Sequence, residues 1–168
     1  MPSSDYMVSW KAQTFSKTWK KNIARKLNVK TSYLLDSWAI MAYFKREQPA
    51  DQQILALLEA AQQNRIQLSL SVINLGEVFY NIGRARGEQF AEYILREMRQ
   101  LPLEIVPVDE TLVLSAARWK MKYPVSYADA FAAATAERLR AILVTGDPEL
   151  MTLKDVLPIE PLERSQRQ

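Results

Sequence analysis

The sequence predicts a three-layer α/β/α domain with a central parallel sheet. Short apolar runs of strand length alternate along the chain with longer segments whose apolar residues recur at helical spacing. Strands that alternate with helices are expected to lie parallel in one sheet. One run, residues 141–144, reads AILV without a polar residue, as expected for a strand covered on both faces. The 168 residues, 48% of them hydrophobic, suit one domain with a normal core.

The first half of the domain shows two strand patterns, each followed by helical patterns. Residues 66–70 alternate apolar and polar side chains, which is the period of a strand. Pro49 separates the first two helical segments, because proline disfavours a helical conformation in the residue before it. The predicted elements are a strand beginning at 33–35, helices over 38–44 and 51–63, a strand over 66–70, and helices over 72–84 and 88–100.

The second half repeats this alternation. Asp109 and Ser126 each precede a helical pattern and are expected to cap it with a side-chain oxygen. The helix after Ser126 contains six alanines, so its backbone can lie close to neighbours on several sides. The predicted elements are a strand over 103–108, a helix after Asp109, a helix over 127–138, the strand at 141–144 and a short edge strand at 158–160.

Composition excludes several kinds of chemistry. The chain has no cysteine and no histidine, so disulfides, thiolate catalysis and imidazole bases or ligands are excluded. Any metal must therefore be bound by oxygen, which favours magnesium or manganese over structural zinc. The four glycines are too few and too far apart to form a G-x-G-x-x-G turn or a Walker A loop.

Basic residues are concentrated at the N-terminus. Residues 1–31 hold seven Lys or Arg against one Asp, a charge of about +6, and since the whole chain carries +3 the remainder carries about −3. Apolar residues recur there at i+4 spacing, which predicts either a basic amphipathic helix with a role in RNA or partner binding, or an appendage ordered only by a partner. The four positions are Phe15, Trp19, Ile23 and Leu27.

The predicted domain occupies residues 32–162, between the extension at 1–31 and a short tail at 163–168. A translation start at Met7, or an organellar transit peptide, would also account for the composition of the extension. No apolar run approaches the roughly 20 residues needed to cross a bilayer, and the N-terminus lacks the apolar core of a secretory signal. We expect a soluble, cytoplasmic protein without a membrane partner.

Four carboxylates draw attention by their positions. Asp36 and Asp147 directly follow predicted strands, at the edge of a parallel sheet where ligands bind. Asp129 lies near the start of the alanine-rich helix, and Glu77 lies one and a half turns into the helix after the second strand. Converging carboxylates repel one another unless a cation neutralises them, so a divalent metal site is predicted.

Each of these acids also has a local structural explanation. Asp36 and Asp147 are placed to cap the helical turns that follow them. Ser126 and Asp129 fit the S-x-x-D form of a capping box. Glu77 lies away from the apolar face of its helix and is open to interpretation as a surface residue. A purely structural acid would bond only within its own helix end, whereas a functional one would also face the other acids.

Four stretches match a known family in order and spacing. They are LLDS at 34–37, NLGEV at 74–78, YADA at 127–130 and LVTGD at 143–147. Together they resemble the motifs of PIN domains, and most of all the ribonuclease toxins, called VapC, of VapBC toxin–antitoxin pairs. By this resemblance Asp36, Glu77, Asp129 and Asp147 are the catalytic, metal-binding acids, and Thr145 is a supporting hydroxyl. The basic extension departs from the family, whose domain usually starts near its first strand.

The resemblance implies a PIN-like fold and a magnesium- or manganese-dependent endoribonuclease. Its expected substrate is single-stranded or loop RNA, cut to give a 5′-phosphate and a 3′-hydroxyl. The metal would lower the pKa of a water and stabilise charge on the scissile phosphate. A homodimer formed through the later helices is also implied. So is a small antitoxin in a groove of the early helices, with candidate contacts at Tyr43, Phe44, Phe79, Phe90 and Tyr93.

A basic, aromatic stretch just before the alanine-rich helix is a candidate RNA-binding surface, since it offers cations and a stacking ring. Its residues are Arg118, Trp119, Lys120 and Lys122. The alternative is a solvated helix end with Trp119 packed inward. Both interpretations are open from the sequence.

Other functions fit the sequence less well. A receiver domain would need adjacent acids near the first strand and a late lysine, and neither is clearly present. A haloacid-dehalogenase phosphatase needs D-x-D, whereas this chain has Asp36-Ser37-Trp38. A non-catalytic RNA- or protein-binding module is the alternative from another class. Metal-dependent cleavage would separate it from an enzyme.

Overall fold

The computed structural model describes residues 30–164. The chain divides into two units, Met1–Lys30 and Thr31–Gln168, and the described helices and strands all belong to the second. The amphipathic helix predicted within the extension lies outside the described residues. None of the helices between residues 30 and 164 has the length and apolar character needed to cross a membrane.

Helices and strands alternate in the predicted order. The first half contains β1 (Thr31–Leu35), α2 (Ser37–Lys45), α3 (Ala50–Gln62), β2 (Ile66–Ser71), α4 (Val72–Arg86) and α5 (Glu88–Met98). The second half contains β3 (Glu104–Val106), α6 (Glu110–Lys122), α7 (Tyr127–Leu139), β4 (Ile142–Thr145), α8 (Pro148–Met151) and β5 (Ile159–Pro161). Each predicted element is present, including the short edge strand β5.

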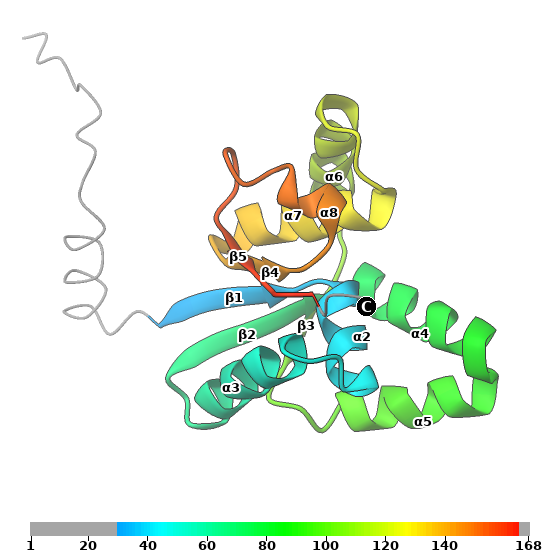
Figure 1. The fold of residues 1–168 in the computed structure, drawn as a ribbon. Helices are drawn as coiled ribbons and strands as arrows, with labels where there is room; N and C mark the ends of the chain where they lie inside the picture. Colours follow the sequence, from blue (N-terminus) through cyan, green and yellow to red (C-terminus); the bar gives the residue numbers. More distant parts are fainter. Residues whose placement is uncertain (1–29, 165–168) are drawn as a thin grey trace, which may run out of the picture. The chain divides into compact units, whose positions relative to one another are not determined.

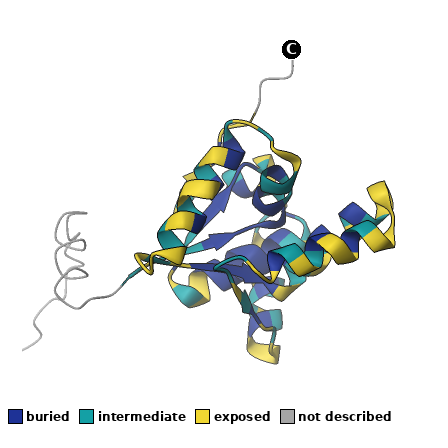
Figure 2. Cartoon of the chain, turned by 90° about the horizontal axis from the view of Figure 1, so that it is seen from below, coloured by how far each residue is buried: buried dark blue, intermediate teal, exposed yellow. Residues whose placement is uncertain are grey.

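The strands of the described chain form one sheet in the order β3-β2-β1-β4-β5, and every neighbouring pair is parallel. Helices α2 to α5 cover one face and α6 to α8 cover the other (Figure 1). The predicted three-layer α/β/α fold is therefore confirmed. Figure 2 shows the strands buried between helices whose outer faces are exposed.

Alternating side chains of the strands enter two separate cores. Leu34 pairs with Leu143 across β1 and β4, and both belong to the core under α6 and α7. The next pair, Leu35 and Val144, belongs to the core under α2 to α5. Since successive residues of a strand point to opposite faces, the apolar run of β4 contributes to both layers.

Helix α7 lies in the middle of its layer and contacts β1, β2 and β4 as well as α4, α6 and α8. Every residue from Asp129 to Ala136 is buried. The small alanine side chains permit this close approach on several sides, as the composition predicts. Below α7, the register places the small Ser69 of β2 beside Leu34.

Several boundaries differ from the predictions by one or two residues, and two of the differences have a clear cause in the sequence. Strand β3 has three residues instead of six, because Pro102 and Pro107 lack the N–H that a longer ladder would need. Helix α4 continues two residues further, to Arg86, and ends at Gly87, whose φ of 88° favours glycine. Helix α5 then starts at once.

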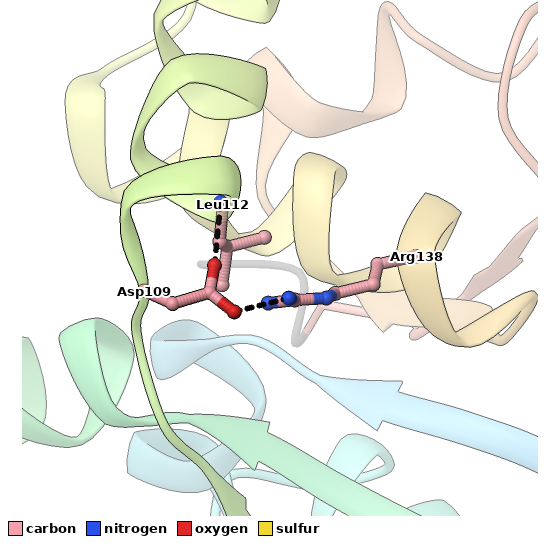
Figure 3. Close-up of polar contacts among 3 residues, drawn as sticks. All are labelled: Asp109, Leu112 and Arg138. Atoms are coloured by element: carbon pink, nitrogen blue, oxygen red, sulfur yellow. Dashed lines mark hydrogen bonds and ion pairs between the residues drawn. The ribbon is translucent and has the colours of Figure 1, made fainter.

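Helices α6 and α7 are joined by an ion pair at the far side of the layer. Asp109 caps α6 by accepting a hydrogen bond from the N–H of Leu112, at 2.8 Å, as predicted. Its second carboxylate oxygen accepts a hydrogen bond from the guanidinium of Arg138 on α7 (Figure 3). Asp109 thus caps α6 and binds α7 through the same carboxylate.

Candidate active site

The site lies where the connections of the sheet diverge. From β1 the chain moves outward to β2 and β3, and it then returns to β4 on the other side of β1. In open parallel sheets such a switch point leaves a crevice beyond the carboxyl ends of the two strands. Asp36 directly follows β1, and Asp147 follows β4 after one glycine.

Asp36 is 1% exposed and uses both carboxylate oxygens. Its Oδ1 accepts a hydrogen bond from the N–H of Ala39 at 2.7 Å, which caps α2. Its Oδ2 accepts one from the hydroxyl of Thr145 at 2.5 Å, across from β4. Burial raises the pKa of Asp36 to about 7, with further repulsion from Asp129 and Asp147, although the two hydrogen bonds oppose the rise.

Thr145, fully buried at the end of β4, connects the two strand-end acids. Its hydroxyl donates to Asp36 and accepts a hydrogen bond from the N–H of Asp147 at 2.9 Å. The carboxylate of Asp147 accepts one from the N–H of Glu149 at 2.7 Å and so caps the short α8. The capping roles predicted for Asp36 and Asp147 are both present, and both residues also lie at the carboxyl ends of neighbouring strands.

Asp129 is not engaged as a capping box would require. Its N–H donates to the hydroxyl oxygen of Ser126 at 3.1 Å, as predicted. The N–H of Ser126, however, donates to Glu149 at 2.9 Å and not to Asp129. The pKa of Asp129 is raised to about 6 by burial, against the effect of the Ser126 hydroxyl, and by repulsion from Asp147, Glu77 and Glu149.

Glu77 projects from α4, and two neighbours hold its carboxylate. Its Oε2 accepts hydrogen bonds from the hydroxyl of Ser37 at 2.6 Å and from the amide of Asn74 at 3.4 Å. The same Asn74 amide donates to the carbonyl of Ala128 at 3.3 Å, so it also ties α4 to the first turn of α7. Glu77 therefore faces the start of α7, which excludes the interpretation as a plain surface residue.

The four acids form one negatively charged group. Burial is the main cause of the raised pKa values of Asp36 and Asp129, and repulsion between the acids raises them further. Within residues 30–164 the recorded ion pair joins Asp109 to Arg138, and no Lys or Arg is paired with any of the four. In the same residues no three acids are positioned to hold one metal ion together. The carboxylates are instead held by hydroxyl, amide and backbone donors.

This arrangement coincides with a family match. The family model of the PIN domain matches residues 33–155, which is most of the chain. The chain belongs to the PIN domain family. The resemblance noted in the four sequence stretches is thereby confirmed at the level of the family. No curated protein matches the sequence.

Solved structures share the fold of this PIN domain. VapBC2 from Rickettsia felis, bound to a DNA fragment from its promoter, matches with a TM-score of 0.62 and 17% identity, over 79% of this chain and 100% of that chain. A toxin–antitoxin complex from Klebsiella pneumoniae matches with a TM-score of 0.57 and 19% identity, over 76% of this chain and 95% of that chain. VapC20 from Mycobacterium tuberculosis, a sarcin-ricin loop cleaving toxin, matches with a TM-score of 0.58 and 14% identity, over 71% of this chain and 93% of that chain.

Sequence patterns missed three residues that the PIN domain brings to the acids. Asn74 is fully buried three residues before Glu77, a spacing that places both on one face of α4. Ser37 lies next to Asp36 in the LLDS stretch, where the sequence assigns it no role of its own. Glu149 bonds to Ser126 from α8 and adds to the charge around Asp129. The roles of Asn74 and Ser37 are indicated by their sequence distance from Glu77 and Asp36. The role of Glu149 depends on the packing of α8 on α7 and has no such indication.

The basic stretch divides into exposed cations and a buried ring. Arg118, Lys120 and Lys122 are exposed on α6. Trp119 is 8% exposed, and its indole N–H donates to Glu137 of α7 at 3.0 Å. It lies seven residues after Leu112, on the α6 face that packs on α7. The prediction that Trp119 offers a stacking surface is therefore wrong, and the alternative of inward packing holds.

An apolar groove lies between α2, α4 and α5. It encloses about 460 Å³, and its lining includes Phe44 and Phe90, two of the five aromatic residues predicted for such a groove. Tyr43, Phe79 and Tyr93 are not among its lining residues. Lys45 and Arg86 stand at its edge, and the guanidinium of Arg86 lies 4.2 Å from the ring centroid of Phe90.

Proposed function

We propose that this PIN-domain protein is a metal-dependent endoribonuclease and the toxin of a toxin–antitoxin pair, acting in the cytoplasm. The observation that supports this most is the gathering of Asp36, Glu77, Asp129 and Asp147 at the switch point of the sheet, with no Lys or Arg of residues 30–164 paired to them. Uncompensated carboxylates at this position are costly to the fold, which is typical of a functional site.

The four acids are the proposed metal ligands. Since no three acids of residues 30–164 are positioned to hold one ion together, metal binding would require their side chains to move closer. Their oxygen donors suit a hard cation. Burial, and secondarily repulsion between the acids, raises the pKa values of Asp36 and Asp129, and a bound cation would stabilise the charged carboxylates against both effects. A bound magnesium or manganese ion would supply Lewis-acid stabilisation of the phosphate and a water of lowered pKa. Because ligands must be deprotonated, binding would be stronger above the pKa values of both groups.

The surrounding residues restrict where the carboxylates can point before metal and substrate arrive. The hydroxyl of Thr145 orients Asp36, and that of Ser37 orients Glu77. Asn74 sets the approach of α4 to α7, and so of Glu77 to Asp129. Holding charged ligands by buried neutral donors lowers the reorganisation needed in the reaction.

The proposed substrate is single-stranded or loop RNA. The exposed cations Arg118, Lys120 and Lys122 on α6 would contact backbone phosphates, which position a strand without reading its sequence. RNA as the substrate class is supported by the likeness in fold to VapC20, a toxin that cleaves an RNA loop.

The groove between α2, α4 and α5 is the proposed seat of a small antitoxin. Its apolar lining suits one face of a helix, and the cations at its edge suit acidic residues beside that face. Toxin–antitoxin complexes among the similar folds support a partner of this kind. A homodimer through the later helices is also proposed, since α6 exposes Met121 at 85% and Leu114 at 48%.

Incubation of the purified protein with a mixed RNA pool tests the proposal. Cleavage is expected with magnesium or manganese and not with excess EDTA, and the new ends should carry a 5′-phosphate. Equal cleavage in EDTA would overturn the metal mechanism. RNA binding without cleavage in either metal would overturn the enzyme and favour the non-catalytic binding module.

A further inference from the structure

Glu149 is a further acid near Asp129, and the sequence patterns assign it no role. It lies in the first turn of α8, two residues after Asp147, and its side chain is exposed. Its N–H donates to the carboxylate of Asp147 at 2.7 Å. Its own carboxylate turns toward α7 and accepts the N–H of Ser126 at 2.9 Å.

These bonds form a continuous path between two acids of the site. Asp147 accepts from Glu149, Glu149 accepts from Ser126, and the Ser126 hydroxyl oxygen accepts from the N–H of Asp129 at 3.1 Å. Asp129 and Asp147 belong to different elements, α7 and the loop after β4. On its other side the first turn of α7 is held by Asn74, which donates to Ala128.

We infer that Glu149 is a positioning residue, whose hydrogen bond to Ser126 holds the start of α7, and with it Asp129, at a set distance from Asp147. The inference rests on the proposed function, because it concerns acids proposed to act together. A capping-box acid would bond to Ser126 from within α7, whereas Glu149 bonds from α8 and so couples two elements. A small displacement of a reacting group from its productive position lowers the reaction rate strongly.

The charge of Glu149 and its hydrogen bond have opposite consequences. The charge repels Asp129, whereas the bond orients the helix turn that bears it. Glutamine keeps an oxygen acceptor of the same reach and removes the charge. Alanine removes both. The two variants therefore separate positioning from metal binding, for which the charge is needed.

The experiment compares Glu149→Gln and Glu149→Ala with wild type and with Asp155→Ala, a control at an exposed acid in the turn after α8. Glu149→Ala is expected to lower kcat by about tenfold with KM changed less than about twofold, and Glu149→Gln to restore kcat to within about threefold of wild type. The control should match wild type. Hydrogen exchange should show the Ser126 amide protected in wild type and Glu149→Gln, and unprotected in Glu149→Ala.

Three results would overturn the inference. Equal losses in Glu149→Gln and Glu149→Ala would mean that the charge acts, as in a metal ligand. Wild-type kcat in Glu149→Ala would mean that the bond has no catalytic effect. An unprotected Ser126 amide in wild type would mean that the bond is absent in solution. If wild type cleaves no RNA, the proposed function fails, and the Ser126 amide then decides the positioning bond by itself.

Discussion

Two aspartates with the same local role differ in everything else. Asp36 caps α2 through the N–H of Ala39 at 2.7 Å, and Asp109 caps α6 through the N–H of Leu112 at 2.8 Å. The second oxygen of Asp109 meets the guanidinium of Arg138 in solvent, and this hydrogen bond holds the pKa of Asp109 below its usual value (Figure 3). Burial raises the pKa of Asp36 to about 7.

A helix cap is therefore compatible with either a structural or a chemical role. Capping uses one carboxylate oxygen, and the surroundings of the second decide the chemistry. Beside Asp36 those surroundings are Thr145 and two further acids, Asp129 and Asp147. Beside Asp109 they are a cation and water. The acids at the carboxyl ends of β1 and β4 therefore repel one another, whereas the charge of Asp109 between α6 and α7 is neutralised by Arg138.

The largest expected effect separates the two regions by activity. Asp129→Asn should lower RNA cleavage by at least about 100-fold, because the amide keeps the shape but loses the charge of a proposed ligand. Without metal the variant should melt no lower than wild type, since repulsion with Asp147 and Glu77 is relieved. Asp36→Asn should behave in the same way.

Asp109→Asn is the matched control for this prediction. It should cleave RNA within about twofold of wild type and melt lower, because it loses a charged partner of Arg138. Melting curves in EDTA and cleavage rates in magnesium give both readouts. Retained cleavage together with a lowered metal-free melting temperature in Asp129→Asn would assign Asp129 a structural role.

The pH dependence of stability should have opposite signs in the two regions. In the folded protein Asp36 keeps its proton to about pH 7, whereas the unfolded chain releases it near 3.8. The folded state therefore binds more protons between these values, and its stability in EDTA should fall as pH rises through this window, by up to about 4 kcal/mol from this group.

Asp109 acts in the other direction, because its pKa is lowered. Its contribution is present above pH 3.8 and is lost as pH falls below that value. Urea unfolding in EDTA from about pH 4.5 to about pH 8 measures the slope. Asp36→Asn should reduce the decline and leave the part that comes from Asp129, whose pKa is raised to about 6, and Asp109→Asn should leave the decline unchanged. A wild-type stability that rises over this range would contradict the assigned burial of Asp36.

The smallest expected effect tests how tightly side chains pack at the carboxyl ends of β1 and β4, where the acids lie. A Cβ on Gly146, next to Asp147, would come within 2.4 to 2.9 Å of three ring atoms of Trp38, two residues after Asp36. Gly146→Ala should therefore destabilise the protein by about 1 to 3 kcal/mol. Gly76→Ala is the control, since nothing lies within 4 Å of its Cβ position, and it should stabilise α4 by about 0.5 to 1 kcal/mol. If urea unfolding gave the same change in the free energy of unfolding for both variants, the ring of Trp38 would move aside at little cost.

The sequence alone determined the order of helices and strands, the parallel sheet and the acids at the strand ends. These follow from patterns within a few residues: the apolar run of β4, the alternation of β2, and capping residues directly before helices. A family resemblance in four short stretches then identified Asp36, Glu77, Asp129 and Asp147 as a set. Local periodicity could not show that these acids face one another.

Tertiary structure decided which partners each side chain meets. Thr145 bonds to Asp36 across 109 residues of sequence, and Ser37 bonds to Glu77 across 40. The N–H of Ser126 is within reach of Asp129 in the sequence, yet it bonds to Glu149 because α8 packs on the start of α7. Likewise Trp119 is buried because its face of α6 meets α7. A local pattern limits what a residue can bond to nearby, whereas burial, pKa and charge depend on segments that only the folded chain brings together.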